Sequence, residues 1–106
     1  MKIAIIGSTQ YKQKFFDHAE KMITNGHEIR IPAFDDHPEL DELGVCLYNR
    51  EAIIWADRID VIWDQRSIGT IFDFGMVFMA NKPIKIVYLE QKTFRGVFEK
   101  YEAMHK

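Results

Sequence analysis

Four short runs of apolar residues alternate along the chain with longer segments whose apolar residues recur at helical spacing. The short runs are continuous, which is typical of strands buried on both faces of a parallel sheet. The runs predicted as strands are 2–6, 28–31, 60–63 and 84–88. The segments predicted as helices are 14–25, 45–56, a run that begins near Thr70 and ends at Asn81, and a last segment from about Thr93.

Each predicted helix has an apolar face, and glycine or proline punctuates the elements. Gly26 ends the first helix, Pro32 closes the second strand and Pro83 follows the third helix. The first helix carries Phe15, Ala19, Met22 and Ile23 at helical spacing. The second has Leu47, Tyr48, Ala52 and Trp55 available to face the sheet, and the last presents Val97, Phe98, Tyr101 and Met104.

Strands that alternate with helices predict an α/β fold with a parallel sheet. Right-handed connections give the strand order 2-1-3-4, in a small flavodoxin-like or Rossmann-like three-layer sandwich whose four-stranded sheet is flanked by helices. At 106 residues the chain is expected to form a single domain, 1–106.

This strand order makes the first and third strands neighbours, so the loops that follow them meet at the switch point of the sheet. Ligands of open α/β sheets bind at such a point, beyond the carboxyl ends of the strands. The loops are 7–11 and 64–73. Their convergence is the main reason to expect a binding site.

The first loop is Gly7-Ser8-Thr9-Gln10-Tyr11. Gly7 lets the backbone approach a ligand, and Ser8 and Thr9 add hydroxyl groups ahead of a helix, where a phosphate or a sugar can bind. An ordinary strand-ending turn explains the same residues. Lys12 and Lys14 are near enough to reach a phosphate, although a solvated helix face accounts for them equally well.

The second loop offers Asp64, Ser67, Gly69 and Thr70 as substrate-binding candidates. Asp64 is placed to bind sugar hydroxyls, or to form a turn. Gly69 permits a tight turn over a ligand. Arg66 is a candidate for holding a phosphate or an acid, and an exposed loop arginine is the plainer alternative.

Asp73 is the candidate catalytic carboxylate. We expect it in the first turn of the third helix, where the helix dipole favours the ionised form. An ionised carboxylate can attack or stabilise a cationic sugar centre. The alternative is a capping box, in which Thr70 caps the helix and Asp73 bonds back to the cap.

Aromatic residues fall into two predicted groups. Trp63, Phe72 and Phe74 are expected in the core. Tyr11 and Phe34 lie on predicted loops beside the cleft and are candidates for stacking on a base. The acidic loop 35–42 has a suitable length for a flap over the site.

The composition argues against several classes of partner and function. With 47% hydrophobic residues the chain can bury a core, and a net charge of −2 without a basic block argues against a nucleic-acid polymer as partner. A single cysteine, Cys46, and four scattered histidines predict no disulfide, no metal and no cofactor. Without a bilayer-length apolar run or a signal-peptide pattern, we expect a cytoplasmic protein that has no membrane partner.

Three motifs together resemble the nucleoside 2-deoxyribosyltransferase superfamily, which includes hydrolases of 2′-deoxynucleoside 5′-monophosphates. They are Ala56-Asp57-Arg58-Ile59-Asp60-Val61-Ile62, then Gly69-Thr70-x-x-Asp73-x-Gly75, then Asn81-Lys82-Pro83-Ile84. The first strand, ending in Gly7-Ser8, fits the same pattern, so the resemblance covers most of the chain.

The resemblance implies a double displacement. A Glu at the position of Asp73 attacks the anomeric carbon, releases the base and forms a deoxyribosyl ester, which a second base or water displaces. The family's assisting Asp falls on Asn49, its strand-one Tyr falls on Ala4, and Gly7-Ser8 would hold the 5′ end. Family members complete their sites with residues of a neighbouring subunit, so a homodimer or higher homo-oligomer is expected. Segment 93–101 is a candidate for that role, or for a plain covering helix.

Three functions follow from these observations. The leading hypothesis is cleavage or transfer of the N-glycosidic bond of a (deoxy)nucleoside or its 5′-monophosphate, with Asp73 as nucleophile or stabiliser and with Asn49 beside it. The second is a weakened nucleotide-binding or sensing module, suggested by the departures at Asp73, Asn49 and Ala4. The third is a phosphoribohydrolase of the cytokinin-activating type, which the Gly69-Thr70 segment faintly resembles.

Overall fold

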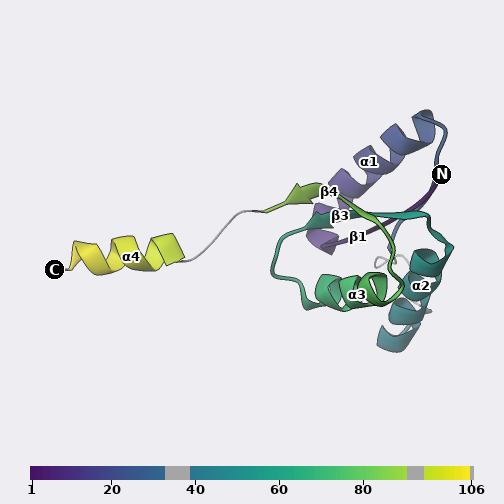
Figure 1. The fold of residues 1–106 in the computed structure, drawn as a ribbon. Coiled ribbons are helices and arrows are strands. Elements are labelled where there is room, and N and C mark those ends of the chain that lie inside the picture. Colours follow the sequence, from purple (N-terminus) through teal and green to yellow (C-terminus); the bar gives the residue numbers. More distant parts are fainter. Residues whose placement is uncertain (33–38, 91–94, 106) are drawn as a thin grey trace.

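The computed structural model describes residues 1–32, 39–90 and 95–105, where strands and helices alternate in the predicted order (Figure 1). The predicted boundaries agree with the observed ones to within about three residues. The elements are β1 (Lys2–Gly7), a 3-10 turn η1 (Thr9–Tyr11), α1 (Lys12–Thr24), β2 (Glu28–Arg30), α2 (Glu42–Trp55), β3 (Arg58–Trp63), α3 (Ile68–Met79), β4 (Ile84–Leu89) and α4 (Arg95–Met104).

The strands form one parallel sheet in the order β2-β1-β3-β4, which confirms the predicted α/β fold. In the central pair, Ile5 lies opposite Asp60 and Gly7 lies opposite Ile62. Helix α1 covers one face of the sheet, and α2 and α3 cover the other (Figure 1). Helix α4 lies apart from the sheet, beyond the end of β4.

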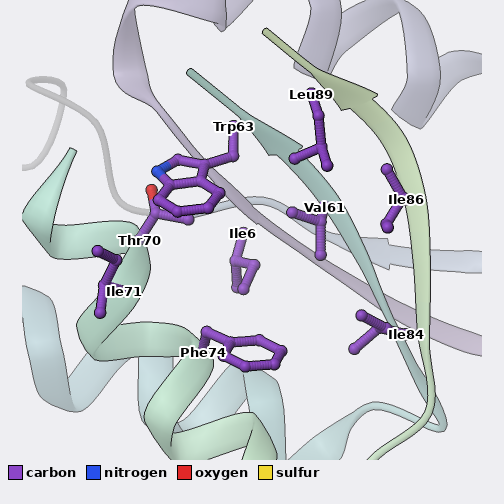
Figure 2. A pocket seen from close by; sticks show the side chains of 9 residues that line it. All are labelled: Ile6, Val61, Trp63, Thr70, Ile71, Phe74, Ile84, Ile86 and Leu89. Atoms are coloured by element: carbon purple, nitrogen blue, oxygen red, sulfur yellow. The ribbon is translucent and has the colours of Figure 1, made fainter. Parts of the chain in front are cut away.

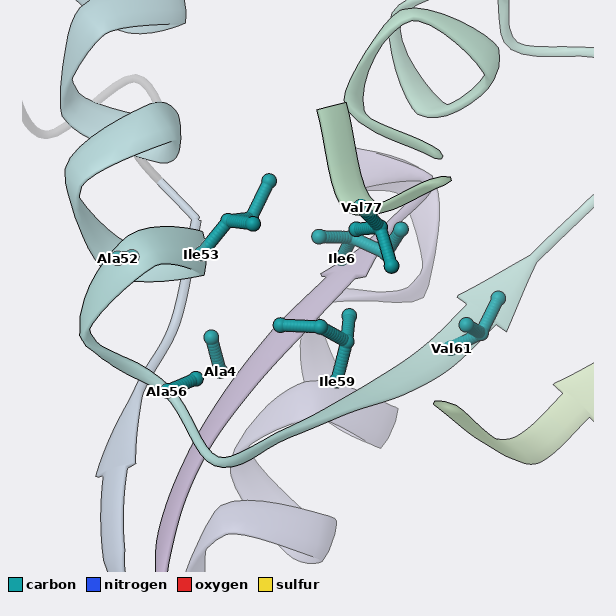
Figure 3. Close-up of a cluster of buried hydrophobic side chains, with 8 residues drawn as sticks. All are labelled: Ala4, Ile6, Ala52, Ile53, Ala56, Ile59, Val61 and Val77. Atoms are coloured by element: carbon teal, nitrogen blue, oxygen red, sulfur yellow. The ribbon is translucent and has the colours of Figure 1, made fainter. Parts of the chain in front are cut away.

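The main core fills the layer between the sheet and helices α2 and α3 (Figure 3). Branched side chains of β1 and β3 meet Ala52 of α2 and its C-cap Ala56, whose small size lets the helix lie close to the strands. A smaller cluster beneath α1 contains Phe15 and Ile62. The main cluster comprises Ala4, Ile6, Ala52, Ile53, Ala56, Ile59, Val61 and Val77.

Helix α2 begins three residues earlier than expected because Asp41 caps it. Its Oδ1 accepts the backbone N–H of Gly44 at 2.7 Å, which satisfies a donor in the first turn. The cap lies in the segment predicted as an acidic flap. Residues 35–38 of that segment, with Phe34, lie outside the described residues.

Several apolar residues that we expected to be buried are exposed. Strand β4 was predicted to be a buried strand, yet Ile84 is 41% and Ile86 57% exposed, because β4 is an edge strand and α4 does not cover it. Phe72 and Phe74 of α3 were expected in the core, but both are exposed, because the side that α3 turns inward carries Thr70, Asp73 and Val77. Ile23, Leu47 and Tyr48 are likewise exposed.

A buried polar cluster joins α1 to the middle of β3. Asp60 is fully buried, and its carboxylate accepts from Nε2 of His18 at 2.6 Å and from Nε of Arg58 at 2.7 Å. Because an ionised carboxylate only accepts hydrogen bonds, the Nε2 of His18 carries a proton. These bonds offset the cost of placing a carboxylate inside the sheet.

Candidate functional site

The carboxyl ends of β1 and β3 lie side by side, so the structure brings the two predicted loops together. The backbone N–H of Ser8 donates to the carbonyl oxygen of Ile62 at 2.9 Å. A Cβ added at Gly7 would lie 1.7 Å from the same oxygen. The close approach of the neighbouring strand therefore accounts for the glycine without a ligand.

Hydroxyl groups join the two loops. The Oγ of Ser8 accepts the backbone N–H of Asp64 at 2.9 Å and lies 3.0 Å from the Oγ of Ser67. The Oγ of Ser67 in turn lies 2.8 Å from the Oγ1 of Thr70. Ser8 is 3% and Thr70 4% exposed, so their hydroxyls hold the two loops together from within and are shielded from solvent.

Asp64 shapes the second loop. Its Oδ1 accepts the backbone N–H groups of Arg66 and Ser67, each at 2.9 Å, so it has the turn-forming role that we considered. Burial raises the pKa of Asp64, but these bonds, with those from the hydroxyls of Ser8 and Ser67, outweigh it and lower the pKa to about 2.

Asp73 lies in the second turn of α3, because the helix begins at Ile68 with Ser67 as its N-cap. Both sequence expectations are therefore wrong: the carboxylate is not in the first turn, and no capping box forms. The hydroxyl of Thr70 contacts Ser67, and the carboxylate of Asp73 accepts Nδ2 of Asn49 at 3.4 Å.

The environment of Asp73 also differs from the one expected. The residue is 7% exposed and Asn49 is 9% exposed, in the layer where α2 packs against α3. Burial raises the pKa of Asp73 to about 6, and the hydrogen bond from Asn49 offsets only part of this effect. Asp73 lies beyond the first turn, where the helix dipole has fallen off, so desolvation decides the direction of its pKa shift.

Polar residues at intervals of three connect the loop junction to Asp73. They are Asp64, Ser67, Thr70 and Asp73, and we call them the polar row. Residues three apart lie on one face of a helix, which explains why the row continues from the loop into α3. The row ends at a carboxylate with a perturbed pKa, which is a common property of functional sites.

An apolar groove of about 180 Å³ lies between α3, β3 and β4 (Figure 2). Thr70 is the point where the polar row reaches this groove, beside Trp63. Asp73 and Asn49 do not line it. The lining residues are Ile6, Val61, Trp63, Thr70, Ile71, Phe74, Ile84, Ile86 and Leu89.

Tyr11 belongs to a second polar group that the sequence did not indicate. Its hydroxyl and that of Tyr88 both donate to Oε2 of Glu90, at 3.2 and 2.8 Å. The two rings pack edge to face with centroids 5.2 Å apart, so Tyr11 is already packed against an aromatic partner. The bond to Glu90 raises the pKa of Tyr88 to about 12. Gln65 joins this group through the carbonyl oxygen of Glu90.

The remaining predicted residues lie at the margin of the site or away from it. Thr9 and Arg66 are exposed on the two loops, and Gly69 lies in the first turn of α3 with open space beside it. Lys14 lies over the ring of Tyr88, with Nζ 4.3 Å from the centroid. Ala4, where the resemblance would place a tyrosine, is buried in the main core.

Within residues 1–32, 39–90 and 95–105, no group of three His, Cys, Asp or Glu side chains could hold a metal ion. In the same residues, no helix has the length and apolar character needed to span a bilayer.

Comparison with known proteins gives no match. No protein-family model fits the chain, and no curated protein and no solved structure is significantly similar to it. The fold is therefore known from the structure, and function has to be argued from the site and from the motifs.

Proposed function

We propose that this domain cleaves or transfers the N-glycosidic bond of a (deoxy)nucleoside or its 5′-monophosphate. The observation that supports the proposal is the buried carboxylate of Asp73, with a pKa raised to about 6, at the end of a polar row that starts where β1 and β3 meet. At neutral pH this carboxylate is mostly ionised and poorly solvated. That state favours interaction with a positively charged sugar centre.

The proposed chemistry uses Asp73 twice. Its oxygen bonds to the anomeric carbon as the bond from that carbon to the base nitrogen breaks, and the electron pair leaves with the base, which then takes a proton. Water or a second base attacks the same carbon and frees the carboxylate. Asn49 donates to Oδ2 and holds the orientation of the group, so that Oδ1 is the attacking atom.

The loops supply the remaining functions. Ser8 and Ser67 hold the two loops together, and they are buried or half-buried and hydrogen-bonded. Thr9 and Arg66 are exposed at the rim, and in this proposal they bind the 5′-hydroxyl or the 5′-phosphate. An arginine guanidinium is well suited to bind phosphate oxygens.

A second candidate function is nucleotide binding without turnover. Two observations favour it: Asp73 is only 7% exposed and is not among the residues that line the groove. An amide at position 49 also cannot exchange a proton as a carboxylate does. In this version the domain senses or sequesters a nucleotide.

One chromatographic assay separates the two functions. The protein at high concentration is incubated with ribo-, deoxyribo- and 5′-phosphorylated substrates, and free base is measured against a control without protein. Catalysis predicts base release that Asp73→Asn abolishes and that Asp17→Asn, the same change on the exposed surface of α1, leaves intact. Preferential release from ribonucleotides would instead favour the phosphoribohydrolase.

If no substrate yields base, the catalytic proposal is wrong. Calorimetry on the same compounds then tests the second function, which requires binding in the micromolar range. Absence of both turnover and binding would reject both candidates.

A further inference from the structure

A depression of about 270 Å³ lies between α1 and the strands β3 and β4, and we call it the α1 pocket. It is on the face of the sheet that α1 covers, whereas Asp73 lies in the layer of α2 and α3 on the other face (Figure 1). The strands contribute apolar and aromatic residues to the pocket. The residues that α1 contributes are all polar: Lys14, Asp17, His18 and Lys21. The proposed chemistry uses none of them.

His18 is held at one ring nitrogen and open at the other. It is 9% exposed, and its Nε2 donates to the fully buried carboxylate of Asp60 at 2.6 Å. Its Nδ1 has no hydrogen-bond partner in the described part of the chain, where no buried side-chain nitrogen or oxygen lacks one. Nδ1 is therefore not buried, and it is accessible from the pocket that His18 lines. Histidines that bind ligands or transfer protons are oriented by a carboxylate in the same way.

Positive charges flank His18 along α1. Lys14 precedes it by four residues and Lys21 follows it by three, so the three side chains share one side of the helix. Both lysines are exposed, and their Cα atoms are roughly 10 Å apart along the axis, a gap that two long side chains can close around a small anion. Asp17 carries the one opposing charge, and its Oδ1 accepts Nε2 of Gln13 at 2.9 Å. The charge on α1 at the pocket is therefore positive overall.

A β-bulge in β4 completes the pocket. Ile62 pairs with Tyr88, whereas the residue before Ile62 pairs with Ile86. Val87 is therefore an extra residue in β4. In a regular strand, Tyr88 would share a face with Ile86, which lines the groove on the other side of the sheet. The bulge turns Tyr88 toward α1, where Nζ of Lys14 lies 4.3 Å from its ring centroid, and this cation–π contact holds the lysine at the pocket.

We propose that the α1 pocket binds the phosphate group of a phosphate monoester, with Lys14 and Lys21 on its oxygens and Nδ1 of His18 as a third contact. Near neutral pH, such a phosphate is present both with and without a proton on its three terminal oxygens. It can therefore accept hydrogen bonds from both lysines, and it can either accept from a doubly protonated His18 or donate to Nδ1 of a neutral one. The surfaces of Val87 and Tyr88 suit a small apolar group on the ester.

This inference goes beyond the proposed function and does not depend on it. The test is ¹⁵N NMR of the histidine rings in the full chain at pH 7, titrated with phenyl phosphate at constant ionic strength. We expect saturable shifts of the His18 ring nitrogens with a dissociation constant of about 1 mM or lower. Phenyl sulfate has the same shape, one negative charge fewer and no proton to donate, so it should bind about fivefold more weakly.

Substitutions at exposed positions locate the site without disturbing the buried contact to Asp60. Lys14→Gln and Lys21→Gln should each raise the dissociation constant about fivefold, since each removes one ion pair with the phosphate. Lys100→Gln is the matched control, because it makes the same change at an exposed position of α4 and should leave binding unaltered. Thermal melts confirm that each variant is folded.

Four results would overturn the inference. The first is no saturable shift of His18 at phenyl phosphate concentrations up to about 10 mM. The second is equal binding of phenyl sulfate, and the third is equal effects of Lys21→Gln and Lys100→Gln. The fourth is weaker binding in Arg66→Gln but not in Lys21→Gln, which would place the phosphate at the rim of the other site. Because phenyl phosphate has no sugar and no base, these results leave the proposed glycosidic chemistry to its own assay.

Discussion

Two carboxylates at opposite ends of the polar row have opposite environments. Asp64 accepts two backbone N–H groups in its loop, and its pKa is lowered to about 2. Asp73 is buried between two helices with an amide 3.4 Å away, and its pKa is raised to about 6. The loop uses the first carboxylate to hold its shape, whereas the second accepts a long hydrogen bond from Asn49 of α2. The contrast indicates which of the two is available for chemistry.

The two pKa shifts have opposite effects on the stability of the folded protein. Hydrogen bonds that lower the pKa of Asp64 stabilise the folded protein above that pKa, because the unfolded chain holds its proton more tightly. Burial of Asp73 acts in the opposite direction. The folded protein holds its proton more tightly, so stability falls as the pH rises from about 4 to about 6.

The largest expected effect is on the pH dependence of base release. Only ionised Asp73 can attack, so kcat/KM should fall about tenfold for each pH unit below about 6, or ~100-fold between pH 7 and pH 4. A pH–rate profile measures this loss. A profile that is flat down to pH 4 would assign the chemistry to a different group, with Asp64 as the first alternative.

The next effect is on stability at the loop. Asp64→Ala removes both backbone hydrogen bonds and should lower the free energy of unfolding by about 2 kcal/mol, as the loss of a helix cap does. Urea unfolding at pH 7.5 measures the change. Asp17→Ala, at an exposed position on α1, serves as the control and should alter stability by less than about 0.5 kcal/mol. If the two variants lost the same free energy of unfolding, the hydrogen bonds of Asp64 would have no specific role in stabilising the loop.

Asp73→Asn should have the opposite effect. At pH 8 the variant no longer buries a charge, so its free energy of unfolding should exceed that of the wild type by about 1 kcal/mol. At pH 4 the wild-type carboxyl is protonated and the gain should vanish. Urea unfolding at both pH values tests this, and a variant less stable than the wild type at pH 8 would contradict it.

The smallest expected effect comes from Asn49→Asp, which places a second carboxyl group beside Asp73. Like charges at this distance resist joint ionisation, so the apparent pKa of the pair should rise by about one unit. Carboxyl NMR titration measures the rise. The same change at Asn25, which caps the exposed end of α1, should leave the titration of Asp73 unaltered.

Much of the fold follows from the sequence. Continuous apolar runs distinguish the strands from the helices, whose apolar residues recur at helical spacing, and right-handed connections determine the strand order. The meeting of Ser8 with Ser67 follows from that order. The exposure of Phe78 and Ile86 could not be predicted, since residues of an uncovered apolar face have the same composition as a core.

The prediction that Asp73 lies in the first turn of its helix was wrong for a local reason. Thr70-x-x-Asp73 matches a capping box, and the spacing cannot show that the helix starts at Ile68.

The partners of the two unpredicted acids lie far away along the chain. Asp60 bonds to His18 from another element, and Glu90 bonds to Tyr11, so no local pattern indicates either group. An acidic residue in a buried strand needs a hydrogen-bond partner, so Asp60 at the start of its apolar run is a signal in the sequence. The run does not show which residue that partner is.

The buried Asp60 also makes sheet assembly intolerant of error. Successive strand residues point to opposite faces, so sliding β3 by one position along β1 would turn this carboxylate from His18 toward the hydrocarbon beneath α2 and α3. An unpaired charge there costs several kcal/mol. A single acid therefore disfavours pairings of β3 with β1 that are shifted by one residue, while the chain is still folding.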